Sequence, residues 1–144
     1  MKLYGYMSNE EFSKLTAGCE LKHPKKNHSQ NRTNSHGFCF LGEQTEFVDS
    51  DGDSHIFSPE ECLQFLCGIV KTGSILVEFE TEPENVEETY GIYCDPYGST
   101  FFFSSSNIEI KEYCTNSYNR DTFKLLRYKA TSFDVCDDVW YDIN

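Results

Sequence analysis

Short segments of apolar or alternating residues recur along this chain and constrain its fold more than any other feature. In residues 75–80 apolar side chains alternate with glutamates, a pattern typical of a strand with one exposed face. The aromatic content of 15% supplies large side chains for a packed core. Further strands are expected over residues 3–7, 37–41, 90–94, 100–103, 107–113 and 123–129, with an edge strand in the tail 133–143.

Two short helices are predicted from capping boxes. Ser8 is followed three residues later by Glu11, and Ser58 is followed by Glu61, so each serine hydroxyl can accept from the glutamate amide while the carboxylate reaches back. A glycine after each apolar helical stretch can end the helix. Strands outnumber helices and do not alternate with them regularly. We therefore expect one α+β domain over residues 1–144, with mostly antiparallel strands and two short capped helices.

The net charge of −12 limits the kinds of molecule that the protein is expected to bind. It disfavours direct binding to nucleic acid, because phosphate contacts need Lys and Arg, and it disfavours an anionic membrane surface. Two interpretations of the acidity fit: ordinary solubility, or a carboxylate-covered surface that imitates nucleic acid. The seven cysteines have no Cys-x-x-Cys spacing, and the first residues lack the apolar stretch of a signal peptide. The expected location is the cytoplasm, where thiols stay reduced.

Residues 22–36 form the most unusual segment. They contain four Lys and Arg residues, three histidines and no acid, together with many Asn, Ser and Thr residues. A basic, hydroxyl-rich loop suits a phosphate or pyrophosphate group, but a solvated loop that offsets the acidic body fits as well. The histidines and cysteines lack zinc-site spacing, and the Asp-rich stretch 49–60 has its glycine in the wrong position for a calcium loop. No metal site is predicted.

Acidic residues on two predicted strands are the remaining candidates for chemistry. Glu78 and Glu80 share one face of their strand, because strand side chains alternate. Glu112 shares its face with Ile108 and Ile110, so its carboxylate is expected on an apolar surface. A carboxylate in that position has either a raised pKa or a specific partner, which suggests function. The alternative is that the strand ends before Glu112 and the side chain is solvated.

The order of these segments resembles the ADP-ribosyltransferase-like family. A strand and a capped helix precede the basic segment, which ends in Thr33-Asn34-Ser35 and leads into an aromatic strand. A second capped helix and a late strand with Glu112 follow, then a polar turn and Phe123-Lys124-Leu125-Leu126. The family has a Ser/Thr-rich start of its second strand and a catalytic Glu on a late strand. The resemblance covers most of the chain through short motifs.

The resemblance implies a cleft that binds NAD and breaks its nicotinamide–ribose bond. Glu112 would be catalytic and stabilise the oxocarbenium-like transition state. Where the family has Arg or His on the first strand this chain has Gly5, so an inactive member that keeps only the scaffold also fits. Ile110 replaces the Gln or Glu of arginine-modifying members, which makes arginine an unexpected acceptor. The residues implied in cofactor binding are Tyr4, Tyr6, Arg32, Thr33 and Ser35.

A different function class fits the same sequence. The chain has the size and acidity of a non-catalytic binding or inhibitor protein, of the phage type that counters host defence through a protein interface. Its tail mixes apolar and aromatic residues with Asp134, Asp137, Asp138 and Asp142. If the chain is an enzyme, Glu112 should be buried in a cleft lined by Thr33, Ser35 and Tyr4 or Tyr6. If it is a binding protein, it should have a continuous acidic face that includes these aspartates, and no deep pocket.

Overall fold

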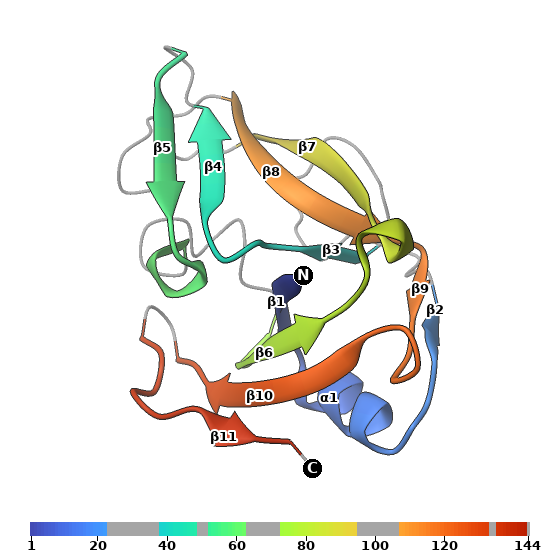
Figure 1. The fold of residues 1–144 in the computed structure, drawn as a ribbon. Helices are drawn as coiled ribbons and strands as arrows, with labels where there is room; N and C mark the ends of the chain where they lie inside the picture. Colours follow the sequence, from blue (N-terminus) through green and yellow to red (C-terminus); the bar gives the residue numbers. More distant parts are fainter. Residues whose placement is uncertain (23–37, 49–51, 63–72, 95–106, 133–134, 144) are drawn as a thin grey trace.

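The computed structural model describes residues 1–22, 38–48, 52–62, 73–94, 107–132 and 135–143. These residues form mostly antiparallel strands with little helix, as the sequence predicts. Figure 1 shows them as two curved sheets, one above the other, with the helix α1 below the lower sheet. The expected strand at 100–103 lies outside the described residues, and so do residues 23–36 of the basic segment 22–36.

The first sheet consists of β1 (Lys2–Met7), β6 (Ile75–Glu80), β10 (Lys124–Ala130) and β11 (Tyr141–Asp142), in that order. All neighbours are antiparallel, and β6 has the bounds that its alternation predicts. Tyr4 of β1 lies opposite Glu78 of β6, which in turn lies opposite Arg127 of β10. Three strands from distant parts of the sequence thus place these side chains in one row.

The second sheet is built around β8 (Asn107–Thr115). β7 (Glu87–Cys94) pairs along one side of it, while β3 (Phe38–Phe40) and β4 (Thr45–Val48) pair along the other. β5 (Ser54–Phe57) is the edge strand beyond β4, and neither β4 nor β5 was expected from the sequence. Tyr4 and Leu41 exchange two backbone hydrogen bonds of 2.8 Å, which connect β1 to the end of β3. β2 (Leu21–Lys22) and β9 (Ser117–Tyr118) form a separate ribbon.

Helix α1 (Asn9–Thr16) begins at the predicted capping box, in which the Glu11 amide donates to the Ser8 hydroxyl at 3.1 Å. The Glu11 carboxylate accepts from the Ser8 amide in return. The second box is formed in the same way at Ser58 and Glu61, and residues 59–62 are helical. The continuation of that second helix lies outside the described residues. A single 3-10 turn, η1 (Pro83–Asn85), connects β6 to β7.

Two groups of buried side chains form the core, and β1 contributes to both because its side chains alternate. Tyr4 and Tyr6 belong to the inner cluster, which consists of Tyr4, Tyr6, Leu41, Phe47, Cys62, Leu76 and Ile110. Leu3 and Met7 point the other way, into a cluster that includes Leu15 of α1. We call this second group the helix cluster: Leu3, Met7, Leu15, Phe38, Phe40, Val77, Phe79, Tyr118, Phe123 and Leu125.

Candidate functional site

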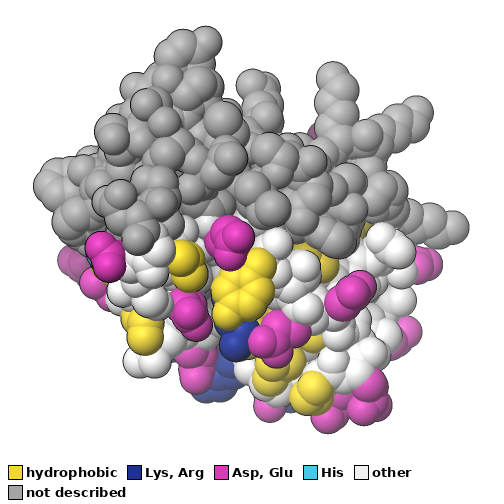
Figure 2. Space-filling view, turned by 90° about the horizontal axis from the view of Figure 1, so that it is seen from above, with side chains coloured by type: hydrophobic (Ala, Val, Ile, Leu, Met, Phe, Trp, Pro, Cys, Tyr) yellow, Lys and Arg dark blue, Asp and Glu magenta, His cyan; other side chains and the backbone are white. Residues whose placement is uncertain are grey.

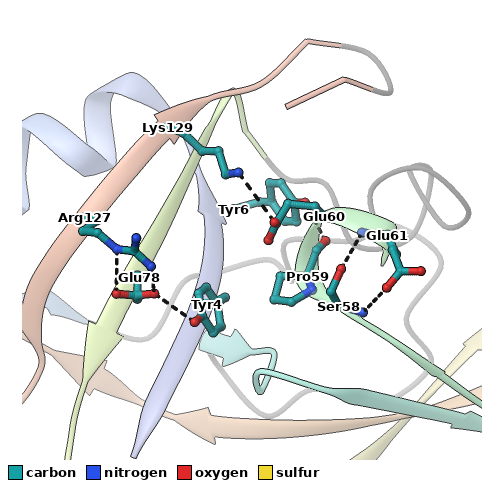
Figure 3. Close-up of polar contacts among 9 residues, drawn as sticks. All are labelled: Tyr4, Tyr6, Ser58, Pro59, Glu60, Glu61, Glu78, Arg127 and Lys129. Carbon is teal, nitrogen blue, oxygen red and sulfur yellow. Dashed lines mark hydrogen bonds and ion pairs between the residues drawn. The ribbon is translucent and has the colours of Figure 1, made fainter. Parts of the chain in front are cut away.

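A polar row crosses the first sheet on the face of the inner cluster (Figure 3). The Arg127 guanidinium donates two hydrogen bonds to the Glu78 carboxylate, from Nε at 3.0 Å and from Nη2 at 2.6 Å. The Tyr4 hydroxyl donates to the same carboxylate at 2.9 Å. Glu78 is only 2% exposed, whereas the Arg127 side chain is 37% exposed. The row therefore runs from a buried carboxylate to a cation that solvent can reach.

A β-bulge places Arg127 in this row. The register of β10 against β6 shifts between Leu125, which faces Phe79, and Arg127, which faces Glu78. Without the extra residue, Arg127 would share a face with Leu125 and point toward the helix cluster, because strand side chains alternate. Bulges commonly redirect a side chain in this way next to functional sites.

The protonation states in this row follow from its hydrogen bonds. Burial alone would raise the pKa of Glu78, but the hydrogen bonds from Arg127 and Tyr4 outweigh burial and hold the pKa of this carboxyl below its usual value. Burial, followed by the hydrogen bond to Glu78, raises the pKa of the Tyr4 phenol. At neutral pH the row therefore contains an ionised carboxylate, a guanidinium and a protonated phenol.

Two cations flank the indole ring of Trp140 beside the row. Arg127 Cζ lies 4.6 Å and Lys129 Nζ lies 4.5 Å from the ring centroid, which are cation–π distances. Lys129 is 5% exposed, and its ammonium lies 3.6 Å from the Glu60 carboxylate (Figure 3). This face therefore combines fixed cations with an aromatic surface, groups that can contact phosphate and heteroaromatic rings.

A surface hollow of about 450 Å³ lies next to this ion pair. Its lining includes Lys129 and Glu60, together with Cys136 from the C-terminal segment. Burial raises the pKa of the neighbouring Tyr6 phenol, whose hydroxyl donates to the Pro59 carbonyl at 2.9 Å. Tyr6 and Tyr4 therefore act as hydrogen-bond donors, not as acids.

Glu112 lies on β8 and is 4% exposed. Ile110 and Cys114, its neighbours on the same face, are 0% and 3% exposed, while Glu109 is exposed. The alternation that predicted a buried Glu112 is confirmed, and the alternative of a solvated strand end is wrong. Ile110 belongs to the same inner cluster as Tyr4 and Tyr6. The catalytic role of Glu112 stays a prediction.

The structure also explains why Gly5 stands where the resemblance leads one to expect Arg or His on the first strand. A Cβ atom on Gly5 would lie 2.9 Å from Cδ1 of Phe40, which belongs to the helix cluster. A long side chain at this position would collide with that ring. A side chain at position 5 would therefore lie on the face opposite Tyr4 and Tyr6, and an Arg or His here would be directed into the core.

Several predicted site residues lie outside the described residues, namely Arg32, Thr33 and Ser35. Tyr4 and Tyr6 are brought together on one face of β1. Sequence reasoning had noted Glu78 only as part of an acidic pair, and it missed the partners of this carboxylate. The alternation of β6 predicts the face on which Glu78 lies. The bulge in β10 interrupts the alternation before Arg127, so the face of Arg127 could not be predicted in the same way.

The C-terminal segment forms an exposed surface of mixed chemistry, which we call the C-terminal surface. Its apolar side chains are strongly exposed: Val135 and Val139 are each 58% exposed and Tyr141 is 51% exposed. Asp137, Asp138 and Asp142 are exposed between them, and Asp134 lies outside the described residues. Acidic and hydrophobic side chains are also interspersed over the face shown in Figure 2.

Two kinds of feature are absent from the described part of the chain. No helix there is long and apolar enough to cross a membrane. Within the same residues, no group of three or more His, Cys, Asp or Glu side chains is placed to hold a metal ion. Comparison of the chain with protein-family models, with curated proteins and with solved structures finds no match.

Proposed function

We propose that this protein binds NAD and transfers ADP-ribose to an acceptor, with Glu112 as the catalytic residue. The observation that carries the proposal is the burial of Glu112 on an apolar face of β8. Buried carboxylates are concentrated at functional sites. Its strand also has the place in the chain that the resemblance to ADP-ribosyltransferases requires.

The first sheet offers groups for the dinucleotide. Tyr4 and Tyr6 lie on the face that carries Arg127 and Lys129, and they pack in one cluster with Ile110 beside Glu112. Because a side chain at position 5 would lie on the opposite face, Gly5 cannot be replaced by a phosphate-binding cation there, and Arg127 of β10 is the cation proposed for that role. Arg127 is partly exposed next to an indole ring, which suits contact with a diphosphate.

In the proposed reaction an acceptor nucleophile displaces nicotinamide from the ribose carbon. The new bond forms between acceptor and ribose as the bond to nicotinamide breaks, and positive charge develops on the ribose. The Glu112 carboxylate would hydrogen-bond a ribose hydroxyl and stabilise that charge. Removing one such interaction typically lowers the rate of the chemical step by about 10²–10³-fold.

The proposal is tested by calorimetric titration with NAD together with an assay of nicotinamide release. Glu112→Gln should lower release by about 100-fold or more and leave NAD binding nearly unchanged, since the amide keeps the shape but loses the charge. The matched control is Glu109→Gln, on the same strand but exposed. It should behave like the wild type. No heat at millimolar NAD with folded protein would refute the proposal.

A second candidate function is favoured by the C-terminal surface. Three strongly exposed apolar side chains lie there among three exposed aspartates. Apolar groups supply contact area, and the carboxylates complement Lys and Arg, so the surface suits a basic protein partner. As the second candidate we therefore propose a non-catalytic binding or inhibitor protein that acts through Val139, Tyr141 and the neighbouring acids.

A synthetic peptide of alternating Lys and Leu is a suitable probe for this surface. Asp137→Asn/Asp138→Asn should weaken peptide binding by about 10-fold at low salt, because two complementary charges are lost. Glu82→Gln/Glu84→Gln removes the same charge from an exposed site in and before η1 and should have little effect. Equal losses in both double variants would show that only net charge matters, which contradicts a defined surface.

A further inference from the structure

Two cysteines lie directly opposite each other in the second sheet. Cys39 of β3 pairs with Cys114 of β8 in the antiparallel register. Residues paired in this way project their side chains to the same face of the sheet. No disulfide links them in the structure.

The backbone hydrogen bonds of β3 show which kind of pair this is. Leu41 N–H donates to the Tyr4 carbonyl and the Leu41 carbonyl accepts from Tyr4 N–H, both at 2.8 Å, so these groups of Leu41 face β1. Backbone groups alternate along a strand, so those of Cys39, two residues earlier, also face away from β8. Cys39 and Cys114 therefore form a non-hydrogen-bonded pair, the kind with the shorter Cα separation of about 4.5 Å.

That separation is compatible with a disulfide, for which the Cα atoms lie roughly 4.4–6.8 Å apart. The two cysteines also differ in their exposure to solvent. Cys39 is half-buried, whereas Cys114 is 3% exposed. A small oxidant can therefore reach Cys39 first, and Cys114 is placed to complete the reaction.

We propose that Cys39 and Cys114 form a redox-modification site that closes to a reversible disulfide with a low-molecular-weight disulfide such as oxidised glutathione. The Cys39 thiolate attacks one glutathione sulfur, which forms a mixed disulfide and releases one glutathione thiolate. The Cys114 thiolate then attacks Cys39 Sγ and displaces the second glutathione. The cysteine pair loses two protons and two electrons, and oxidised glutathione is reduced to two thiols.

The disulfide would join β3 to β8 close to Glu112 in the sequence of β8. Cys114 follows Glu112 by two residues on the same buried face of β8. The disulfide would also close a long loop between residues 39 and 114. A disulfide that closes a long loop restricts the unfolded chain more than one that closes a short loop. Oxidation should therefore stabilise the second sheet and fix the strand that carries Glu112. This inference does not depend on NAD binding.

Mass spectrometry and thermal unfolding test the site directly. Reduced protein is incubated with oxidised glutathione, alkylated and digested without reductant. We expect a cross-linked peptide pair that contains Cys39 and Cys114, lighter by two hydrogen atoms than the two separate peptides. The midpoint of thermal unfolding should rise by about 5–10 °C and return to its starting value with dithiothreitol.

Cys39→Ser is the main variant, because Cys39 is half-buried and serine is tolerated more easily there than at the buried Cys114. It should lose both the cross-link and the thermal shift. Cys19→Ser, at an exposed cysteine, should keep both. The proposal is overturned if both cysteines stay open to alkylation after oxidation, or if either pairs with another cysteine. A thermal shift of wild-type size in Cys39→Ser would overturn it too.

Discussion

Glu78 has almost no contact with solvent, yet it remains ionised because three hydrogen bonds replace its hydration. Two come from Arg127 and one comes from Tyr4. A buried ion pair adds little net stability over apolar side chains of the same shape, but loss of one partner leaves a charge that is buried without compensation. The cation in this row is therefore more important for the fold than its partial exposure suggests.

Arg127→Met should lower the free energy of unfolding by about 2 kcal/mol, the typical value for a hydrogen bond to a charged group. The larger loss seen for fully buried pairs is not expected, because solvent screens this guanidinium. Urea unfolding measures the change. The double variant Glu78→Leu/Arg127→Met should cost less than Arg127→Met alone. If the double variant is the less stable of the two, the buried charge is not the cause.

At the scale of elements, the sequence predicts those features that depend only on neighbouring residues in the chain. Helix α1 begins at Ser8 because its capping box needs only neighbouring residues. The alternation of apolar and acidic residues gave β6 its bounds, and the same alternation gave the buried face of Glu112. The opposite faces of Tyr4 and Gly5 also follow from period two.

Other elements depend on contacts that the local sequence does not show. β5 leaves Ile56 62% exposed, and Phe57 alone of its residues packs against the inner cluster, so its local pattern is weak and the strand depends on pairing with β4. The bulge before Arg127 depends on register against β6. Trp140 reaches two cations because β11 pairs with β10. The polar row could therefore not be predicted from alternation alone.

For the whole molecule, acid sensitivity should depend partly on Glu78. The pKa of its carboxyl is lowered in the folded state, so its stabilisation is present above the unfolded-state pKa of about 4.3 and is lost as pH falls through the folded-state pKa. Thermal unfolding of the wild type and Glu78→Gln should differ most near pH 7. The difference should shrink from about pH 5 downward. A difference that stays constant to pH 2 would contradict this linkage.

The order of strands in the first sheet has a consequence for the protein during its synthesis on the ribosome. β1 is synthesised before both of the strands that follow it in this sheet, because β6 begins at Ile75 and β10 begins only at Lys124. Translation adds roughly 5–20 residues per second, so β1 waits for seconds without its neighbour. Its Leu, Tyr and Met side chains, which are buried in the folded protein, lack these partners during that interval. The nascent chain, more than the finished protein, is therefore the form in which chaperones would find apolar surface.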